Sequence, residues 1–294
     1  MDDEDLKARA IALYDRFTHG AQDRRAFMAD MTKLAGSAAA AQMLVATIAA
    51  DPAAAALIAE DDKRVDAKMV HWAGAGGHKL FGYMAIPRKH RKKPAAVLVV
   101  HENRGLQPYT KDVARRLAVA GFVGVALDFL APVGGTPPKD EDEARRMIGA
   151  LDLAAATADG VATIDWLAAN KLLNGKVGTV GFCWGGAMAN RLAVAAGPKL
   201  QAAVAFYGPP PPPVEAGKVK AALMLHYAGT DDRVNAGAAL WVAALQAAHA
   251  DVRRFDYPGT QHAFHNDTSA ARYDAAAASL AWDRTIAFFR EKLA

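Results

Sequence analysis

Two patterns of apolar and polar positions divide the chain near residue 63. Residues 1–62 are rich in Ala, Leu and Met and lack strand-like runs, and this pattern predicts three or four short helices. From Val65 onward, short apolar runs alternate with amphipathic stretches of helical period. We therefore expect a helical N-terminal extension over 1–62 and a larger α/β domain over 63–294.

The larger part of the chain predicts strands and helices in alternation. Two alternating segments, 65–74 and 78–87, indicate a β-hairpin that turns through the glycine-rich segment 74–77. Most of the later strands are continuous apolar runs, as expected for strands buried on both faces. Because helices separate these strands, we expect a mostly parallel sheet with helices on both faces, opened by the antiparallel hairpin. The predicted strands are 95–101, 122–128, 176–182, 200–207, 221–227 and 252–258, and the predicted helices are 109–121, 142–152, 153–170, one that starts at Gly185, 236–250 and 269–293.

The composition is that of an ordinary globular protein, with 52% hydrophobic and 22% charged residues. Lys and Arg number 35 against 31 Asp and Glu, which gives a net charge of +4. This excess favours anionic small molecules as ligands but is too small to predict nucleic-acid binding. The densest basic run, 88–93, is cut off by Pro94 and indicates a solvated loop. No segment predicts a transmembrane helix.

A pair of arginines in the extension raises the question of export. Arg24 and Arg25 precede an alanine-rich apolar stretch, the order found in twin-arginine signals. Against that interpretation, an acidic, helix-like segment comes first, and Asp30 and Lys33 interrupt the approach to the apolar stretch. We therefore expect a retained extension and a cytoplasmic protein, with a periplasmic location as the alternative.

The single cysteine of the chain lies at a sharp corner between a predicted strand and a predicted helix, and it permits no internal disulfide. Its surroundings, GFCWG at 181–185, have the Gly-x-nucleophile-x-Gly form. A strand that turns directly into a helix strains the corner residue and leaves room only for glycine two residues away on either side. The thiol would then lie at a helix N-terminus, where a thiolate is favoured. The alternative is that Cys183 is a buried, small apolar residue.

A base and an acid are expected at the ends of later strands. One turn after a strand offers Asp231, with Asp232 as its rival. A later loop offers His262 and His265. Because His262 lies closer to the strand end, we predict that it takes the thiol proton and that Asp231 fixes its tautomer. His265 fits better as a neighbour or a substrate contact.

Four stretches together resemble the dienelactone hydrolase family, whose members are also called carboxymethylenebutenolidases. They are HENRGL, GFCWGG, GTDDRVNAG and YPGTQHAFHND, and the resemblance covers about residues 65–293. It implies an α/β-hydrolase fold and a Cys–His–Asp triad that opens an enol-lactone ring through an acyl-thioester intermediate. Carried onto this chain, the triad is Cys183, His262 and Asp231.

The same resemblance implies further roles around the nucleophile. Glu102 takes the place of a glutamate that pairs with the thiol and assists its deprotonation, and the alternative is an ordinary surface carboxylate. The implied oxyanion donors are the backbone N–H groups of Asn103 and Trp184. Family members that open lactone rings hold the substrate carboxylate with arginines, for which Arg104 and Arg145 are candidates here.

These features predict a cofactor-independent hydrolase that acts on a small, anionic lactone or ester. One alternative is a thioesterase or general carboxylesterase that uses the same residues. Another is a catalytically silent protein whose extension and proline tract, 209–213, bind a partner. A metal enzyme is not predicted, because no cluster of His, Cys and Asp has ligand spacing. A nucleotide cofactor is not predicted either, because the chain lacks the G-x-x-x-x-G-K-[ST] motif.

Overall fold

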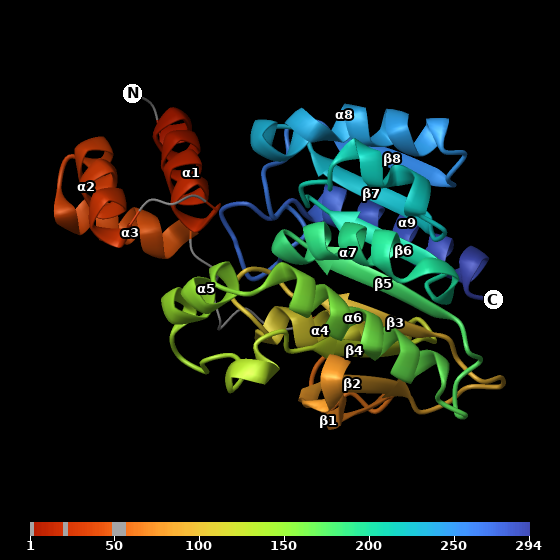
Figure 1. Cartoon of the computed structure of the whole chain (residues 1–294). Helices are drawn as coiled ribbons and strands as arrows, with labels where there is room; N and C mark the ends of the chain where they lie inside the picture. Colours follow the sequence, from red (N-terminus) through yellow and green to blue (C-terminus); the bar gives the residue numbers. More distant parts are fainter. Residues whose placement is uncertain (1–2, 20–22, 49–56) are drawn as a thin grey trace.

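The computed structural model describes residues 3–19, 23–48 and 57–294. In this part of the chain, eight strands form one sheet in the order β1-β2-β4-β3-β5-β6-β7-β8 (Figure 1). β1 and β2 form the predicted antiparallel hairpin, β2 pairs antiparallel with β4, and the other neighbours are parallel, so the expected sheet is confirmed. The strands are β1 (Val65–Ala73), β2 (Lys79–Pro87), β3 (Ala96–Val100), β4 (Val123–Leu127), β5 (Val177–Phe182), β6 (Ala202–Phe206), β7 (Ala222–Ala228) and β8 (Val252–Tyr257). The α-helices are α1 (Asp3–His19), α2 (Arg24–Ala35), α3 (Ala38–Ile48), α4 (Pro108–Val119), α5 (Glu141–Gly149), α6 (Leu153–Ala168), α7 (Trp184–Ala195), α8 (Asp232–Ala247) and α9 (Ala275–Lys292).

Helices cover both faces of the sheet (Figure 1). α6, α7 and α8 pack on one face, and α4 and α9 pack on the other. Alternate residues of β3 show the division, because successive side chains of a strand point to opposite faces. Leu98 and Val100 join the core with α6–α8, whereas Val97 and Val99 join the core with α4 and α9. The central strands are therefore apolar throughout, as the continuous runs predicted.

Two helices begin away from their predicted starts because side chains cap them. α8 begins earlier than predicted, at Asp232, since the Asp231 carboxylate accepts a hydrogen bond from the Val234 N–H. α9 begins later than predicted, since the aspartate that caps its first turn is Asp274. In both helices, the first residue is determined by a polar capping residue that lies outside the apolar repeat. The period of the apolar residues alone therefore predicts the wrong first residue.

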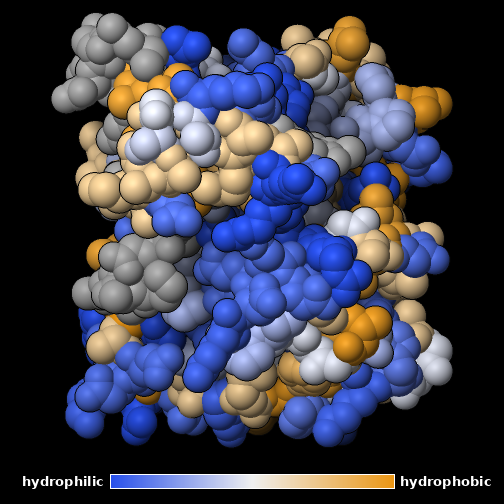
Figure 2. Space-filling model, turned by 90° about the vertical axis from the view of Figure 1, so that its left-hand side faces the viewer, coloured by the Kyte–Doolittle hydropathy of each residue, from blue (hydrophilic) through white to orange (hydrophobic). Residues whose placement is uncertain are grey.

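The extension has a small apolar core of its own, and its described helices, α1 to α3, are of the type that the sequence predicts. The rings of Tyr14, Phe17 and Phe27 meet in this core, with Phe17 stacked on Phe27 at 4.3 Å between centroids. Figure 1 places α1 between the α2–α3 pair and the α/β part. Figure 2 shows the side of the molecule that is on the left in Figure 1. On that side, weakly apolar surface lies mainly in the upper part, beside polar side chains. Within the described residues no single helix is long and apolar enough to cross a membrane, although α5 and α6, bent by 100°, meet those criteria jointly.

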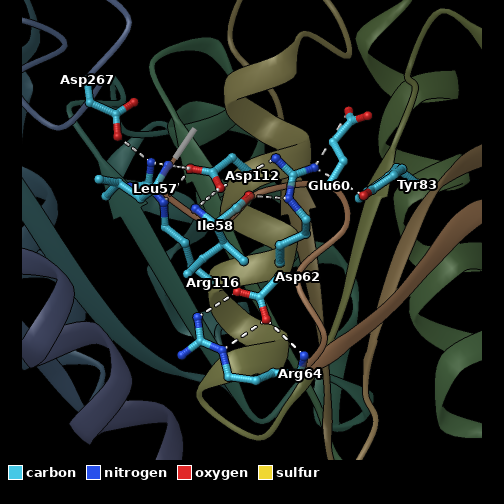
Figure 3. A network of polar contacts seen from close by, with 10 residues as sticks. Leu57, Ile58, Glu60, Asp62, Arg64, Tyr83, Asp112, Arg116 and Asp267 are labelled. Carbon is cyan, nitrogen blue, oxygen red and sulfur yellow. Dashed lines mark hydrogen bonds and ion pairs between the residues drawn. The ribbon is translucent and has the colours of Figure 1, made fainter. Parts of the chain in front are cut away.

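A buried ionic network fixes the chain where the extension leads into the sheet (Figure 3). The N–H groups of Leu57 and Ile58 donate to the Asp112 carboxylate of α4, at 3.2 and 2.9 Å. Arg115 donates to the Ile58 carbonyl oxygen at 2.6 Å, and Arg116 pairs with Asp112. Removing one partner from a buried ion pair is strongly destabilising, so this network ties the start of the α/β part to α4.

His226 of β7 makes the stability of the fold sensitive to acid. The ring is fully buried, and its nitrogens lie 2.8 and 3.2 Å from the hydroxyls of Tyr257 and Thr285. Burial, together with the charge of Arg284, lowers the pKa of His226 to about 3 from 6.5. Below pH 6.5 the unfolded chain binds a proton that the folded chain excludes, so the free energy of unfolding should fall as the pH drops toward 3.

Urea unfolding at neutral pH and at about pH 5 measures this effect. Between the two pH values, the free energy of unfolding of the wild type should decrease by on the order of 2 kcal/mol more than that of His226→Gln. The matched control is His71→Gln, at an exposed position of β1, which should behave like the wild type. Equal losses in all three proteins would contradict the assignment.

Candidate active site

Cys183 lies at the turn between β5 and α7. Its backbone has φ 57° and ψ −116°, a strained combination for a residue with a side chain. Close packing requires the glycines on either side, because a Cβ on Gly181 would overlap the carbonyl oxygen of Gly185. A Cβ on Gly185 would in turn overlap the carbonyl oxygens of Val100 and His101. The chain therefore makes the sharp strand-to-helix turn that the Gly-x-Cys-x-Gly spacing predicts.

His262 and Asp231 meet across the ends of two neighbouring strands, β8 and β7. Nδ1 of His262 and Oδ2 of Asp231 are 2.5 Å apart, and both side chains are buried. Asp232, the rival acid, is exposed at the first position of α8. The structure thus brings Asp231, and not Asp232, to the histidine.

His262 interacts electrostatically with both Cys183 and Asp231. Burial disfavours the charged ring, but the negative charge of Cys183 and hydrogen bonds with Asp231 and Cys183 outweigh it and raise the pKa of His262 to about 10. Burial also opposes the charge of Asp231, yet its hydrogen bond to His262 and the charge of that ring lower the pKa of Asp231. His262 therefore carries a proton at neutral pH and faces a carboxylate on one side and the sulfur on the other.

Glu102 lies just beyond the end of β3, the strand that pairs with β5. Its Oε2 accepts a hydrogen bond from Nδ2 of Asn266 at 2.8 Å, while Oε1 is buried and has no hydrogen-bond partner among the described residues. Burial raises the pKa of Glu102, and the charges of Arg272 and His262 oppose this shift. A carboxyl group with a raised pKa beside the His262 ring is suited to proton exchange.

The backbone groups of Asn103 and Trp184 belong to neighbouring strand ends. Trp184 is the first residue of α7, so its N–H is one of the donors that a helix leaves unpaired at its N-terminus. Asn103 lies in the turn after β3, and Val100 of that strand is opposite Gly181 of β5. The His101 ring stacks on the Trp184 ring with 5.5 Å between centroids. Two N–H groups at such positions are the usual source of an oxyanion hole in this kind of turn.

The two arginine candidates lie on the side of the site that faces the extension. Arg104 pairs with Glu141 of α5 at 2.7 Å and donates to the Tyr14 hydroxyl of α1. Arg145 donates to the Phe17 carbonyl oxygen at 3.1 Å and lies over the Phe17 ring, 4.0 Å from its centroid. Both guanidinium groups therefore contact α1.

His265 lies among aromatic rings. It is almost fully buried, its Nδ1 is 2.6 Å from the Tyr109 hydroxyl, and its ring stacks on Phe182. Burial lowers the pKa of His265 well below its usual range, so the ring is neutral. These contacts favour a packing role for His265 over a contact with substrate.

Three further residues border the site, and no role was predicted for any of them from the sequence. Asn266 had a signal, since it follows His262 within one loop. Arg272 acts on Glu102 through its charge, and both Arg272 and Arg104 lie over the Tyr14 ring, at 5.5 and 5.7 Å from its centroid. Tyr14 belongs to the extension, and no spacing in the sequence connects it to a strand end.

A cavity of about 380 Å³ lies between α1 and the loops that carry the acid and the histidine. Ile11 and Arg16 line it on one side, and Asp231 and His262 line it on the other. Its volume is near the lower end of the range for small-ligand pockets, and Cys183 is not among the residues that line it. Within the described residues, no group of three or more His, Cys, Asp or Glu side chains is placed to hold a metal ion.

Comparison with known proteins assigns the chain to a family. The sequence model of the dienelactone hydrolase family matches residues 80–293. The chain belongs to the dienelactone hydrolase family. A provisionally named carboxymethylenebutenolidase of Saccharolobus solfataricus is 28% identical over 251 residues, which cover 73% of this chain and 95% of that one. Another, from Escherichia coli strain K12, is 28% identical over 258 residues and covers 83% and 93% of the two chains.

A solved structure has the same fold as this dienelactone hydrolase family member. A provisionally named dienelactone hydrolase of Klebsiella pneumoniae matches with a TM-score of 0.66 at 26% identity and covers 76% of this chain and 99% of that one. The predicted α/β-hydrolase fold is confirmed, and family membership makes the chain a hydrolase of esters. The family match begins at residue 80, so α1, α2 and α3 lie outside it.

Proposed function

We propose that this dienelactone hydrolase family member cleaves small, anionic lactones or esters through a cysteinyl acyl-enzyme. Cys183 is the nucleophile, His262 is the base and acid, and Asp231 orients the His262 ring. The observation that supports this assignment is the meeting of the three residues at three strand ends, with Cys183 held at a strained corner and His262 in contact with both partners. Membership in the family supports the class of reaction.

The reaction proceeds in two halves. The Cys183 thiolate adds to the carbonyl carbon, and the backbone N–H groups of Asn103 and Trp184 stabilise the oxyanion. The intermediate collapses to a thioester as the C–O bond breaks, and protonated His262 gives its proton to the leaving oxygen. Neutral His262 then takes a proton from the water that attacks the thioester. Release of the acid restores the thiolate and the protonated ring.

Glu102 assists the ionisation of the thiol in this scheme. When the sulfur is protonated, Glu102 can take the proton, and burial increases the affinity of its carboxylate for it. Arg104 and Arg272 lie on the same side of the site and supply positive charge for a substrate carboxylate. These two guanidinium groups support the proposal that the substrate is anionic, although Arg104 also pairs with Glu141.

Alkylation with iodoacetamide tests the assignment of the nucleophile. Because the chain has one thiol, the extent of modification counted by mass spectrometry should equal the fraction of hydrolytic activity lost. Dienelactone and p-nitrophenyl acetate are the assay substrates, and either one at saturation should slow the alkylation. Full activity after stoichiometric modification of Cys183 would overturn the proposal.

A substrate panel decides between the lactone hydrolase and its close alternatives. Lactones, short esters and acyl thioesters are compared by kcat/KM, with and without a carboxylate on the acyl part. We expect the anionic lactones to rank first. A preference for neutral esters or for thioesters would replace the substrate class and leave the triad assignment in place.

A further inference from the structure

The sulfur and the imidazole of the site are covered from outside. Cys183 and His262 are each only 4% exposed. On the side of the extension, α1 is the element that contacts the site, since it contributes Tyr14 against Arg104 and Ile11 to the cavity that His262 lines. α1, which the family match does not include, therefore lies beside the Cys183–His262 pair on this side of the site.

Tyr14 fastens α1 to the residues around the nucleophile. Its hydroxyl accepts a hydrogen bond from Arg104, and the Arg104 and Arg272 guanidinium groups both lie over its ring. Arg104 interacts through its charge with Cys183, and Arg272 does so with Glu102. Cation–π contacts are strengthened when the ring is desolvated, and a hydrogen bond from a charged donor is stronger than a neutral one, so these contacts favour the position of α1 beside Arg104 and Arg272.

Ile11 forms an apolar wall of the cavity at a position one helical turn before Tyr14. Its side chain is buried, and the His262 ring lies among the groups on the opposite side of the cavity. Two further contacts hold the extension against the α5 region, namely Arg145 with the Phe17 carbonyl oxygen and Arg24 with Asp142. α1 is thus anchored at both the site and α5.

We propose that α1, residues 3–19, is the roof of the substrate site. Tyr14 holds this helix against the residues around the Cys183–His262 pair, and Ile11 limits the size of the acyl group that fits into the cavity beside His262. The statement about acyl groups rests on the proposed function, whereas the statement about access to Cys183 depends only on the position of α1.

Two measurements on the full-length protein test the roof. The first is the second-order rate constant for alkylation of Cys183 by iodoacetamide. The second is the ratio of kcat/KM for p-nitrophenyl octanoate to that for p-nitrophenyl acetate. Tyr14→Ala should be alkylated roughly tenfold faster, because it loses two cation–π contacts and a hydrogen bond. Ile11→Ala should raise the octanoate-to-acetate ratio roughly tenfold, because removing methylene-sized groups opens an apolar pocket.

Matched variants distinguish the loss of the α1 contacts from a general loss of stability. Tyr14→Phe keeps the ring over both guanidinium groups and should be alkylated at nearly the wild-type rate. Met43→Ala truncates a side chain that is 72% exposed on α3, and neither readout should change. Thermal unfolding shows that each variant is folded.

The outcomes are distinct. A wild-type alkylation rate in folded Tyr14→Ala, or a wild-type ester ratio in folded Ile11→Ala, would overturn the proposal, as would equal shifts in Met43→Ala. Alkylation reports access to the thiol whether or not Cys183 is the nucleophile. Failure of the proposed function would instead appear as hydrolysis that survives alkylation.

Discussion

Replacement of Cys183 by alanine should lower kcat/KM for dienelactone and p-nitrophenyl acetate by a factor on the order of 10⁴ to 10⁶. The acyl bond of the proposed intermediate forms on this sulfur, and the chain has no second thiol that could substitute for it. The same change removes the negative charge that raises the pKa of His262, so that pKa should fall from about 10. Steady-state kinetics and NMR titration of the ring measure the two effects.

Cys183→Ser is the companion variant. A hydroxyl keeps nearly the same shape at the corner but is far less ionised than a thiol near neutral pH, so activity should stay low. Both variants should unfold near the wild-type temperature, because the backbone at this corner is determined by the glycines around it. Turnover by Cys183→Ala at a rate close to that of the wild type would contradict the triad.

Replacement of Asp231 by asparagine should lower kcat by a factor on the order of 10³ to 10⁴. The carboxylate accepts a hydrogen bond from Nδ1 of His262 and supports its positive charge, and a neutral amide provides neither the charge nor a defined tautomer. Asparagine caps helices about as well as aspartate, so α8 should remain stable. The expected defect is therefore kinetic, with thermal stability close to that of the wild type.

Asp232→Asn is the matched control for this experiment. It makes the same chemical change one residue later, on an exposed side chain at the start of α8, and kcat should remain near the wild-type value. The reverse result, with Asp232→Asn inactive and Asp231→Asn active, would assign the acid to the rival residue. If kcat falls by the same factor in both variants, the cause is a change in the structure of the turn and not the loss of one carboxylate.

Much of the fold follows from short-range patterns. The apolar runs of β3, β4 and β5 predict buried strands because each must exclude water on both faces, and the structure confirms this. The boundaries of α8 and α9 were wrong, because capping aspartates define helix starts and the apolar repeat does not contain them. Periodicity thus indicates which elements form, and single polar residues decide where they begin.

The candidate site was predictable where chain order and strand ends coincide. Cys183, Asp231 and His262 each follow a strand, and strands of a parallel sheet bring their carboxyl ends to one edge. Tyr14 and Arg272 could not be found in this way, because their contact depends on how the extension packs against distant loops. Such packing depends on the shape and charge of residues that are far apart in the sequence, so no periodic pattern within a short segment predicts it.

The lone sulfhydryl at the corner between β5 and α7 makes the protein convenient to quantify. Ellman's reagent, applied after denaturation, should titrate one equivalent per chain, and any shortfall measures molecules in which this single position has been oxidised to a sulfenic or higher acid. Storage damage by peroxide can thus be read at one atom, without the background that scattered surface thiols add to other enzymes.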